Sequence, residues 1–157
     1  MKSSRIPPPL WMLIFALAMW ALARYWPLAS ILPNEWLWLG WCVIAIAPIA
    51  PIVANIQFRR AQTTANPFKP ETATALVTSG VFSWTRNPMY LGLFILLLGW
   101  AIKLGALSSL IAALLFVPLI YMVQIRAEEY ALRAHFGADY ERYCQQVNRW
   151  LGRRRGI

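Results

Sequence analysis

The sequence predicts an all-α integral membrane protein with four transmembrane helices followed by amphipathic cytoplasmic helices at the C-terminus. Hydrophobic residues make up 59% of the 157 residues and charged residues only 13%, about half the charged share of a soluble domain. A soluble fold of this size could not bury so much apolar surface. Four long runs also carry no charge: 6–23, 36–58, 87–102 and 104–125. A disordered chain, a disulfide-stapled secreted module and most water-soluble enzymes are excluded.

Each uncharged run is a candidate membrane span, for which a helix needs about 20 apolar residues, with about 17 to 25 tolerated. The second and fourth runs qualify outright. The first reaches this length by including Arg24, whose long side chain can extend to the interface, and the third is short and ends near Lys103. Pro48 and Pro51 predict a kink in the second helix, because proline has no N–H to donate.

The connections predict the order in which the helices pair. A short turn at Pro33, Asn34 and Glu35 favours a hairpin of the first two helices. A link around Gly105 makes the third and fourth helices antiparallel. We therefore expect a single domain, 1–157, divided into a first helical hairpin (1–58), a cytoplasmic connector (59–86), a second helical hairpin (87–125) and a cytoplasmic helical tail (126–157).

The tail predicts two helices. Glu129 and Arg133 are spaced four residues apart, which favours an ion pair on one helix. Gly137 suits a helix C-terminus, and Asp139 could cap the next helix. Apolar side chains then recur at spacings of four and three, as on one face of an interfacial amphipathic helix: Phe136, Tyr140, Tyr143, Val147 and Trp150.

The net charge of +9 is explained by membrane topology. With the N-terminus inside, only Arg24 and Lys103 lie on the far side of the membrane, which is a strong positive-inside bias. Both termini are then cytoplasmic, and we expect the inner membrane of a bacterium. The basic residues on the inner side are Lys2, Arg5, Arg59, Arg60, Lys69, Arg86 and every Arg from Arg126 onward. Membrane lipids are therefore the expected partners, and nucleic acid is not.

Several kinds of site are unsupported. The chain has no glycine-rich nucleotide loop, so a Rossmann site is unsupported. His135 is its only histidine, which excludes a His-based metal cluster. Cys42 and Cys144 form no CxxC pair and should be free thiols. We expect no metal.

Two polar clusters remain, at 79–90 and 126–129. An antiparallel second hairpin brings both to one membrane face, where ionisable groups facing a bundle interior are functional candidates. An interfacial Trp and Arg anchor beside a solvated Glu pair explains the same residues equally well.

At these clusters the chain resembles a known family. The first reads Leu76-Val77-Thr78-Ser79-Gly80, Phe82 and Arg86-Asn87-Pro88-Met89-Tyr90; the second, one hairpin later, reads Glu128-Glu129, Leu132, Phe136-Gly137, Tyr140 and Tyr143. This pair of motifs resembles the isoprenylcysteine carboxyl methyltransferase family and the wider membrane methyltransferases that include phospholipid methyltransferases. The resemblance covers 70–151. Asn87 replaces a His, Phe82 replaces a Tyr, and Gln124 occupies the position of an Arg that those enzymes use for the acceptor.

The resemblance implies methyl transfer from S-adenosylmethionine, with the cofactor contacting Thr74, Ala75, Leu76, Val77, Phe82, Asn87, Pro88, Met89, Tyr90 and Glu128. An aromatic face attracts a sulfonium, and Glu128 can pair with the cofactor ammonium. Adjacent helical residues point about 100° apart, so we expect Glu129 to pair with Arg133 instead.

The acceptor implied by the resemblance is a small lipophilic molecule, with a prenylcysteine-like carboxylate favoured. Arg126, Gln124 and Arg86 are the candidates to act on it. Three alternatives remain: a phospholipid amine or thiol as acceptor, an NADPH-dependent steroid-reductase-like enzyme, and a non-enzymatic membrane scaffold.

Overall fold

The computed structural model describes residues 6–63 and 73–153. Within these ranges the chain is helical and forms no strand, only two isolated bridges, which pair Ser30 with Ala106 and Val147 with Arg153. The all-α prediction is therefore confirmed for the described residues. The predicted inner-side charges of Lys2, Arg5, Lys69, Arg154 and Arg155 lie outside them.

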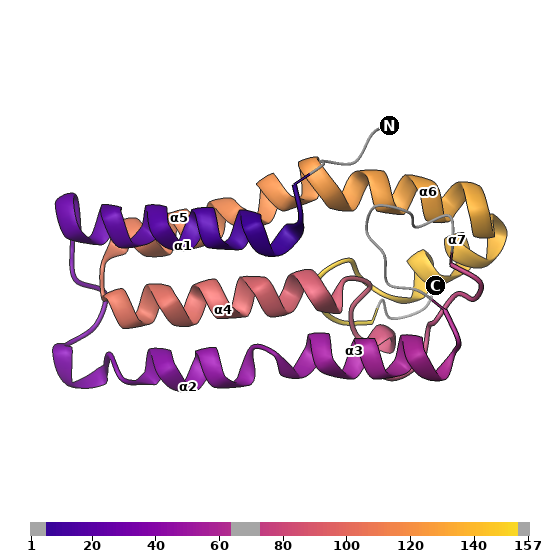
Figure 1. Ribbon diagram of the computed structural model, residues 1–157, viewed down its shortest axis with the longest axis horizontal. Coiled ribbons are helices and arrows are strands. Elements are labelled where there is room, and N and C mark those ends of the chain that lie inside the picture. Colours follow the sequence, from indigo (N-terminus) through magenta and orange to yellow (C-terminus); the bar gives the residue numbers. More distant parts are fainter. Residues whose placement is uncertain (1–5, 64–72, 154–157) are drawn as a thin grey trace. The chain divides into compact units, whose positions relative to one another are not determined.

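Seven α-helices make up the described chain (Figure 1). They are α1 (Pro8–Tyr25), α2 (Leu39–Ile46), α3 (Ile49–Arg60), α4 (Pro88–Leu104), α5 (Leu107–Ile120), α6 (Arg126–Phe136) and α7 (Ala138–Gln146). Short 3₁₀ turns occur at Asn34–Trp36 and Gly80–Ser83, and a π-helical turn at Tyr121–Ile125 joins α5 to α6.

Among the described residues, three helical stretches are long and apolar enough to cross a membrane: Pro8–Tyr25, Asn34–Arg60 and Leu107–Phe136. Pro88–Leu104 is equally apolar but has only 17 residues. The chain is therefore an integral membrane protein with three long apolar helices and a shorter fourth. The helix is interrupted at Pro48, where a kink was predicted, since α2 ends at Ile46 and α3 begins at Ile49; Pro51, the second predicted kink position, lies inside α3.

The described chain divides into two compact units. We call residues 6–49 and 92–122 the apolar unit. Residues 50–63, 73–91 and 123–153 form the motif unit, which contains both sequence motifs. The boundaries between the two units lie near residues 49, 91 and 122. Each unit is therefore built from segments that are distant in sequence.

In the apolar unit, α1 runs alongside α5 (Figure 1). The Ser109 hydroxyl donates a hydrogen bond to the Met19 carbonyl at 2.9 Å, and the rings of Phe15 and Phe116 meet edge to face with centroids 5.4 Å apart. A buried serine on an apolar helix thus finds its acceptor on the neighbouring helix, as polar side chains in membrane helices commonly do.

Helix α2 approaches α4 closely through two glycines. A Cβ placed on Gly40 would lie 2.5 Å from the Gly99 carbonyl oxygen and 2.6 Å from the Lys103 nitrogen. Small residues allow membrane helices to approach at backbone distance. Glycine is therefore required at position 40 by the packing of α2 against α4.

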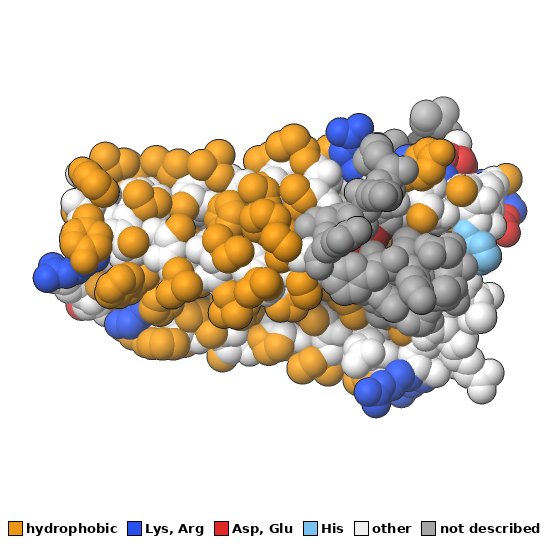
Figure 2. All heavy atoms as spheres, turned by 45° about the horizontal axis from the view of Figure 1, so that its top comes forward, with side chains coloured by type: hydrophobic (Ala, Val, Ile, Leu, Met, Phe, Trp, Pro, Cys, Tyr) orange, Lys and Arg blue, Asp and Glu red, His pale blue; other side chains and the backbone are white. Residues whose placement is uncertain are grey.

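Hydrophobic side chains cover much of the visible face of the apolar unit (Figure 2). Such a surface is unfavourable in water and matches lipid contact. The exposed residues include Leu13, Leu17, Trp20, Trp26, Trp41, Ile46, Leu114 and Leu115.

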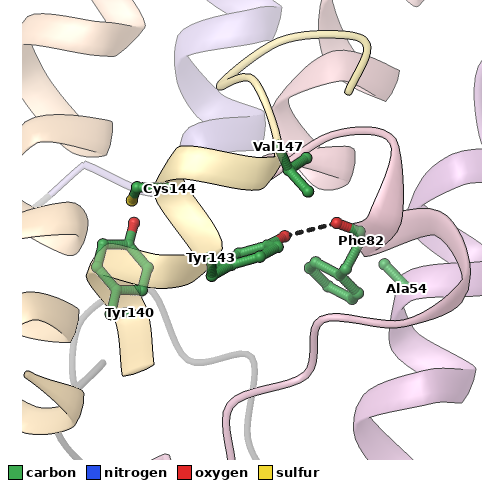
Figure 3. Packing of buried hydrophobic residues seen from close by; sticks show 6 residues of the cluster. All are labelled: Ala54, Phe82, Tyr140, Tyr143, Cys144 and Val147. Carbon is green, nitrogen blue, oxygen red and sulfur yellow. Dashed lines mark hydrogen bonds between the residues drawn. The ribbon is translucent and has the colours of Figure 1, made fainter. Parts of the chain in front are cut away.

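In the motif unit, a hydrophobic cluster joins α3, the Gly80–Ser83 turn and α7 (Figure 3). The rings of Phe58 and Phe82 lie 4.9 Å apart, and the Tyr143 hydroxyl donates to the Phe82 carbonyl at 2.7 Å. Burial raises the pKa of the Tyr143 phenol, which keeps the hydroxyl proton available for this bond. The buried members are Ala54, Phe82, Tyr140, Tyr143, Cys144 and Val147.

The structure corrects two predictions about the tail. Tyr140, Tyr143 and Val147 do share a face, but protein buries them, so the predicted contact of this face with the membrane interface is wrong for these residues. Gly137 ends α6 with φ +52°, as predicted. Asp139 does not cap α7, because the helix already begins at Ala138; its carboxylate pairs with Arg142 within the first turn.

Candidate functional site

The two sequence motifs meet in the motif unit. The Tyr90 hydroxyl, in the first turn of α4, donates a hydrogen bond to a carboxylate oxygen of Glu128, in the first turn of α6. Pro88 begins α4, where its fixed φ suits a helix and its missing N–H costs nothing. Tyr90 and Glu128 are 38 positions apart in the sequence. The predicted convergence of the two motifs is therefore present.

The neighbouring carboxylate, Glu129, sits in a buried ion cluster and is only 4% exposed. Arg149 approaches it with two nitrogens, Nε to Oε1 and Nη2 to Oε2, both at 2.8 Å. Arg86 Nη1 lies 3.3 Å from Oε1. Such two-pronged guanidinium–carboxylate contacts are among the strongest hydrogen bonds in proteins.

This cluster corrects the predicted pair of Glu129 with Arg133. Arg133 instead pairs with Glu141 at 2.7 Å, on the exposed surface. The four-residue rule identifies neighbours along a helix surface, whereas a buried carboxylate must be compensated where it lies. The returning C-terminal segment supplies that compensation through Arg149.

Arg149 is also held by its main chain. Its carbonyl oxygen accepts bonds from Thr85 Oγ1 at 3.3 Å and from Asn87 Nδ2 at 3.2 Å. Close by, the Arg86 N–H donates to the Asn148 carbonyl at 3.2 Å, and the Gly152 N–H donates to the Trp84 carbonyl at 2.7 Å. The segment 148–152 therefore lies along 84–87, the loop that leads into α4.

The sequence pattern placed Thr85 and Glu129 within the two polar clusters without giving either a role in binding, and it did not identify Arg149 as part of the site. Arg149 is 20 residues from Glu129 and 64 residues from Thr85. No periodicity links positions at such separations. For Arg149, the only signal in the sequence was its position on the polar side of the helical pattern formed by Phe136, Tyr140, Tyr143, Val147 and Trp150.

The three residues predicted to act on the acceptor lie in different environments. Arg86 is buried and donates to Cys144 Sγ at 2.6 Å in addition to pairing with Glu129. Gln124 is completely buried within the π-helical turn, whereas Arg126 is exposed. Within the described chain, Arg126 does not join the Arg86–Glu129–Arg149 cluster.

The residues predicted to contact the cofactor fall into two groups. Asn87, Pro88, Met89, Tyr90 and Glu128 belong to the region where the motifs meet. Phe82 belongs to the hydrophobic cluster of Figure 3, and Leu76 and Val77, which are partly buried, pack against that cluster. Thr74 and Ala75 are bonded to the segment that follows α3, since both N–H groups donate to Thr63 Oγ1, at 3.0 and 3.3 Å.

The surroundings of Glu128 suit the amino-acid part of S-adenosylmethionine. Among the described residues, no arginine or lysine forms an ion pair with Glu128, in contrast to its neighbour Glu129. A ligand ammonium would supply the missing cation. The N–H groups of Met89 and Tyr90, in the first turn of α4, have no partner within the helix and suit a ligand carboxylate. No cluster of metal-ligating side chains occurs among the residues described.

Comparison with known proteins supports a membrane methyltransferase. A family model described as phospholipid methyltransferase matches residues 36–139, which include the first motif and both glutamates. An uncharacterized protein of Haemophilus influenzae is 41% identical over 63 residues, which cover 40% of this chain and all of that protein.

Two enzymes are also similar to this chain. The protein-S-isoprenylcysteine O-methyltransferase of Schizosaccharomyces pombe is 36% identical over 72 residues, 46% of this chain and 30% of that enzyme. The Delta(14)-sterol reductase of Gallus gallus is 26% identical over 153 residues, 87% of this chain and 24% of the reductase. The chain thus spans less than a third of either enzyme.

Proposed function

Because the chain belongs to the phospholipid methyltransferase family, we propose that it transfers a methyl group from S-adenosylmethionine to a small lipophilic acceptor at the cytoplasmic face of the membrane. The observation that carries this proposal is the contact between Tyr90 and Glu128. It joins the two motifs and leaves Glu128, alone of the adjacent pair, without a protein cation among the described residues.

Methyl transfer requires mainly that the nucleophile and the methyl group be aligned. S-adenosylmethionine supplies an activated methyl group on a sulfonium. Glu128 binds the cofactor ammonium, Tyr90 orients Glu128 through its hydroxyl, and the first-turn N–H groups of Met89 and Tyr90 bind the cofactor carboxylate. Thr74–Val77 and Phe82 complete the cofactor site on the side of the hydrophobic cluster. The protein aligns the nucleophile with the methyl group and keeps water away from it.

We favour a prenylcysteine-like carboxylate as the acceptor, in keeping with the activity named for the yeast relative. A carboxylate in a low-dielectric site needs a cation. Arg126 is the candidate for that role, because Arg86 already compensates Glu129.

A phospholipid amine or a thiol is the second candidate acceptor. It is favoured by the environment of Gln124, an uncharged side chain that is completely buried, while Arg126 is exposed. The neutral Gln124 amide can form a single hydrogen bond with an amine or a thiol substrate, and it does so without placing a buried charge beside that substrate.

The test uses purified protein, labelled S-adenosylmethionine and lipid extracts, with the product identified by mass spectrometry. A base-labile label is the expected result, because it identifies a methyl ester. A base-stable label would identify an N- or S-methyl product and replace the carboxylate with the second candidate.

Calorimetry in detergent separates the remaining alternatives. We expect S-adenosylmethionine and S-adenosylhomocysteine to bind and NADPH not to bind. The similarity to a sterol reductase makes NADPH the necessary comparison: saturable NADPH binding without a response to the methyl donor would favour a reductase. A non-enzymatic scaffold would bind neither, and Glu128→Gln would then have no consequence for binding.

A further inference from the structure

Arg149 bonds to the chain neighbours of both members of the Tyr90–Glu128 site. Its guanidinium makes two bonds to Glu129 on α6, and its carbonyl accepts bonds from Thr85 and Asn87, which precede α4. A single residue of the C-terminal segment therefore links the start of α6 to the start of α4.

The two linked positions set the two members of the site. Glu128 is adjacent to Glu129 on α6, so a fixed Glu129 side chain fixes the rotation of the helix about its axis and with it the direction of Glu128. Asn87 immediately precedes α4, and Tyr90 lies in the first turn of that helix. A fixed position of Asn87 therefore fixes the start of α4, from which the Tyr90 side chain extends to Glu128.

The contact between Arg149 and Glu129 requires an arginine side chain. The planar guanidinium presents parallel N–H groups that match a carboxylate, whereas a lysine ammonium is a point charge without this orientation. Arg86 contacts Glu129 through Nη1 alone, at 3.3 Å, and the same nitrogen also donates to Cys144 Sγ, so Arg86 does not make the two-pronged contact of Arg149.

We infer that Arg149 is a positioning residue for the cofactor site: it holds α6 and the start of α4 in the register that brings Tyr90 onto Glu128. The inference rests on the proposed function for the identity of the ligand. Loss of alignment by about 1 Å can cost a hundredfold in an enzyme site, so the effect on cofactor binding and turnover should be large.

The experiment is a double-mutant cycle on the full chain in detergent, with S-adenosylhomocysteine as the calorimetric probe. Arg149→Met should raise the Kd by about 10- to 100-fold in the wild-type background. In the Glu128→Gln background it should raise the Kd by less than about threefold, because both changes remove the same contact with the ligand. Equal fold-losses in the two backgrounds would overturn the inference.

Arg142→Met is the matched control. Arg142 also pairs with a carboxylate, that of Asp139, but its side chain is 73% exposed. We expect its Kd to stay within about twofold of wild type, since exposed ion pairs contribute little. If Arg149→Met does not fold, Arg149→Lys replaces it in the double-mutant cycle. Lysine keeps the positive charge and loses only the two-nitrogen contact with Glu129.

A second measurement needs no ligand. In hydrogen–deuterium exchange on the ligand-free protein, Arg149→Met should accelerate exchange across 84–91, and Arg142→Met should not. Unchanged exchange would overturn the positioning role whatever the protein binds. Accelerated exchange in a protein that binds no S-adenosylhomocysteine even as wild type would overturn the proposed function and leave the positioning of Tyr90 by Arg149 intact.

Discussion

The adjacent residues Glu128 and Glu129 have opposite surroundings, although both are carboxylates on one helix. Glu129 is compensated by Arg86 and Arg149, whereas Glu128 receives a hydrogen bond from the Tyr90 hydroxyl. A carboxylate with two guanidinium partners is satisfied by the protein, and one with a neutral partner can still accept a ligand cation. The two residues should therefore respond differently to the same substitution.

We predict that Glu129→Gln lowers stability and, because it removes the contact with Arg149, also lowers cofactor affinity, whereas Glu128→Gln lowers cofactor affinity alone. Removing one member of a buried ion pair costs about 3–5 kcal/mol, so Glu129→Gln should reduce the free energy of unfolding by that order in denaturant titrations. Glu128→Gln should weaken S-adenosylhomocysteine binding by about 1.5–3 kcal/mol, the range for a hydrogen bond to a charged group. Equal losses of affinity with unchanged stability would mean that α6 is rotated differently.

Arg126 decides the class of acceptor. If the acceptor is a carboxylate, Arg126→Ala should abolish methylation and leave the cofactor Kd nearly unchanged, because the residue acts on the acceptor alone. Steady-state rates and calorimetry on the same protein separate the two effects. Arg133→Ala is the control, since Arg133 is an exposed arginine on the same helix that pairs with Glu141. Full activity in Arg126→Ala would put the amine or thiol acceptor first.

At the scale of the element, the close approach of α2 to α4 depends on Gly40. The atoms nearest to an added Cβ are the backbone carbonyl of Gly99 and the backbone nitrogen of Lys103. Backbone atoms cannot turn aside as the end of a flexible side chain can. A methyl group at position 40 must therefore push the helices apart.

We predict that Gly40→Ala destabilises the protein, which is the opposite of the helix-propensity effect. In a helix interior, alanine is favoured over glycine by roughly 0.5–1 kcal/mol, but overpacking at a tight contact costs about 1–3 kcal/mol. Thermal unfolding in detergent should show a lower midpoint. Gly137→Ala is a useful comparison: no atom lies within 4 Å of its Cβ position, so only the strain of its positive φ is added. A raised midpoint for Gly40→Ala would show that α2 and α4 do not pack at this distance.

At the scale of the whole molecule, the distribution of basic residues predicts that both termini face the cytoplasm. The chain segment between α1 and α2 then faces the opposite side. Ser30 lies in that segment and Gln145 lies on α7, and both are exposed. The two positions should therefore be accessible from opposite sides of the membrane.

Cysteine labelling checks this topology. In a background with Cys42 and Cys144 replaced by alanine, a membrane-impermeant maleimide should label Ser30→Cys in right-side-out vesicles and Gln145→Cys only in inverted ones. Each variant serves as the control for the other. Labelling of both from one side would contradict the proposed topology.

The sequence by itself determined the elements that composition controls. Long uncharged runs predicted the apolar helices, because the transfer of apolar side chains out of water depends on local composition. Pro48 and Gly137 marked a break and a helix end through backbone chemistry that acts at a single residue. The two motifs also predicted that Tyr90 and Glu128 belong to one site.

Only the tertiary structure decided which partners the buried groups take. Glu129 pairs with Arg86 and Arg149 instead of Arg133, and the apolar face of α7 packs against Phe82 instead of lipid. The contact of Arg149 with Glu129 joins residues 20 positions apart, and that of Tyr143 with Phe82 joins residues 61 positions apart. Helical periodicity relates residues three or four apart, whereas compensation of a buried charge depends on whichever chain segment the fold returns to it.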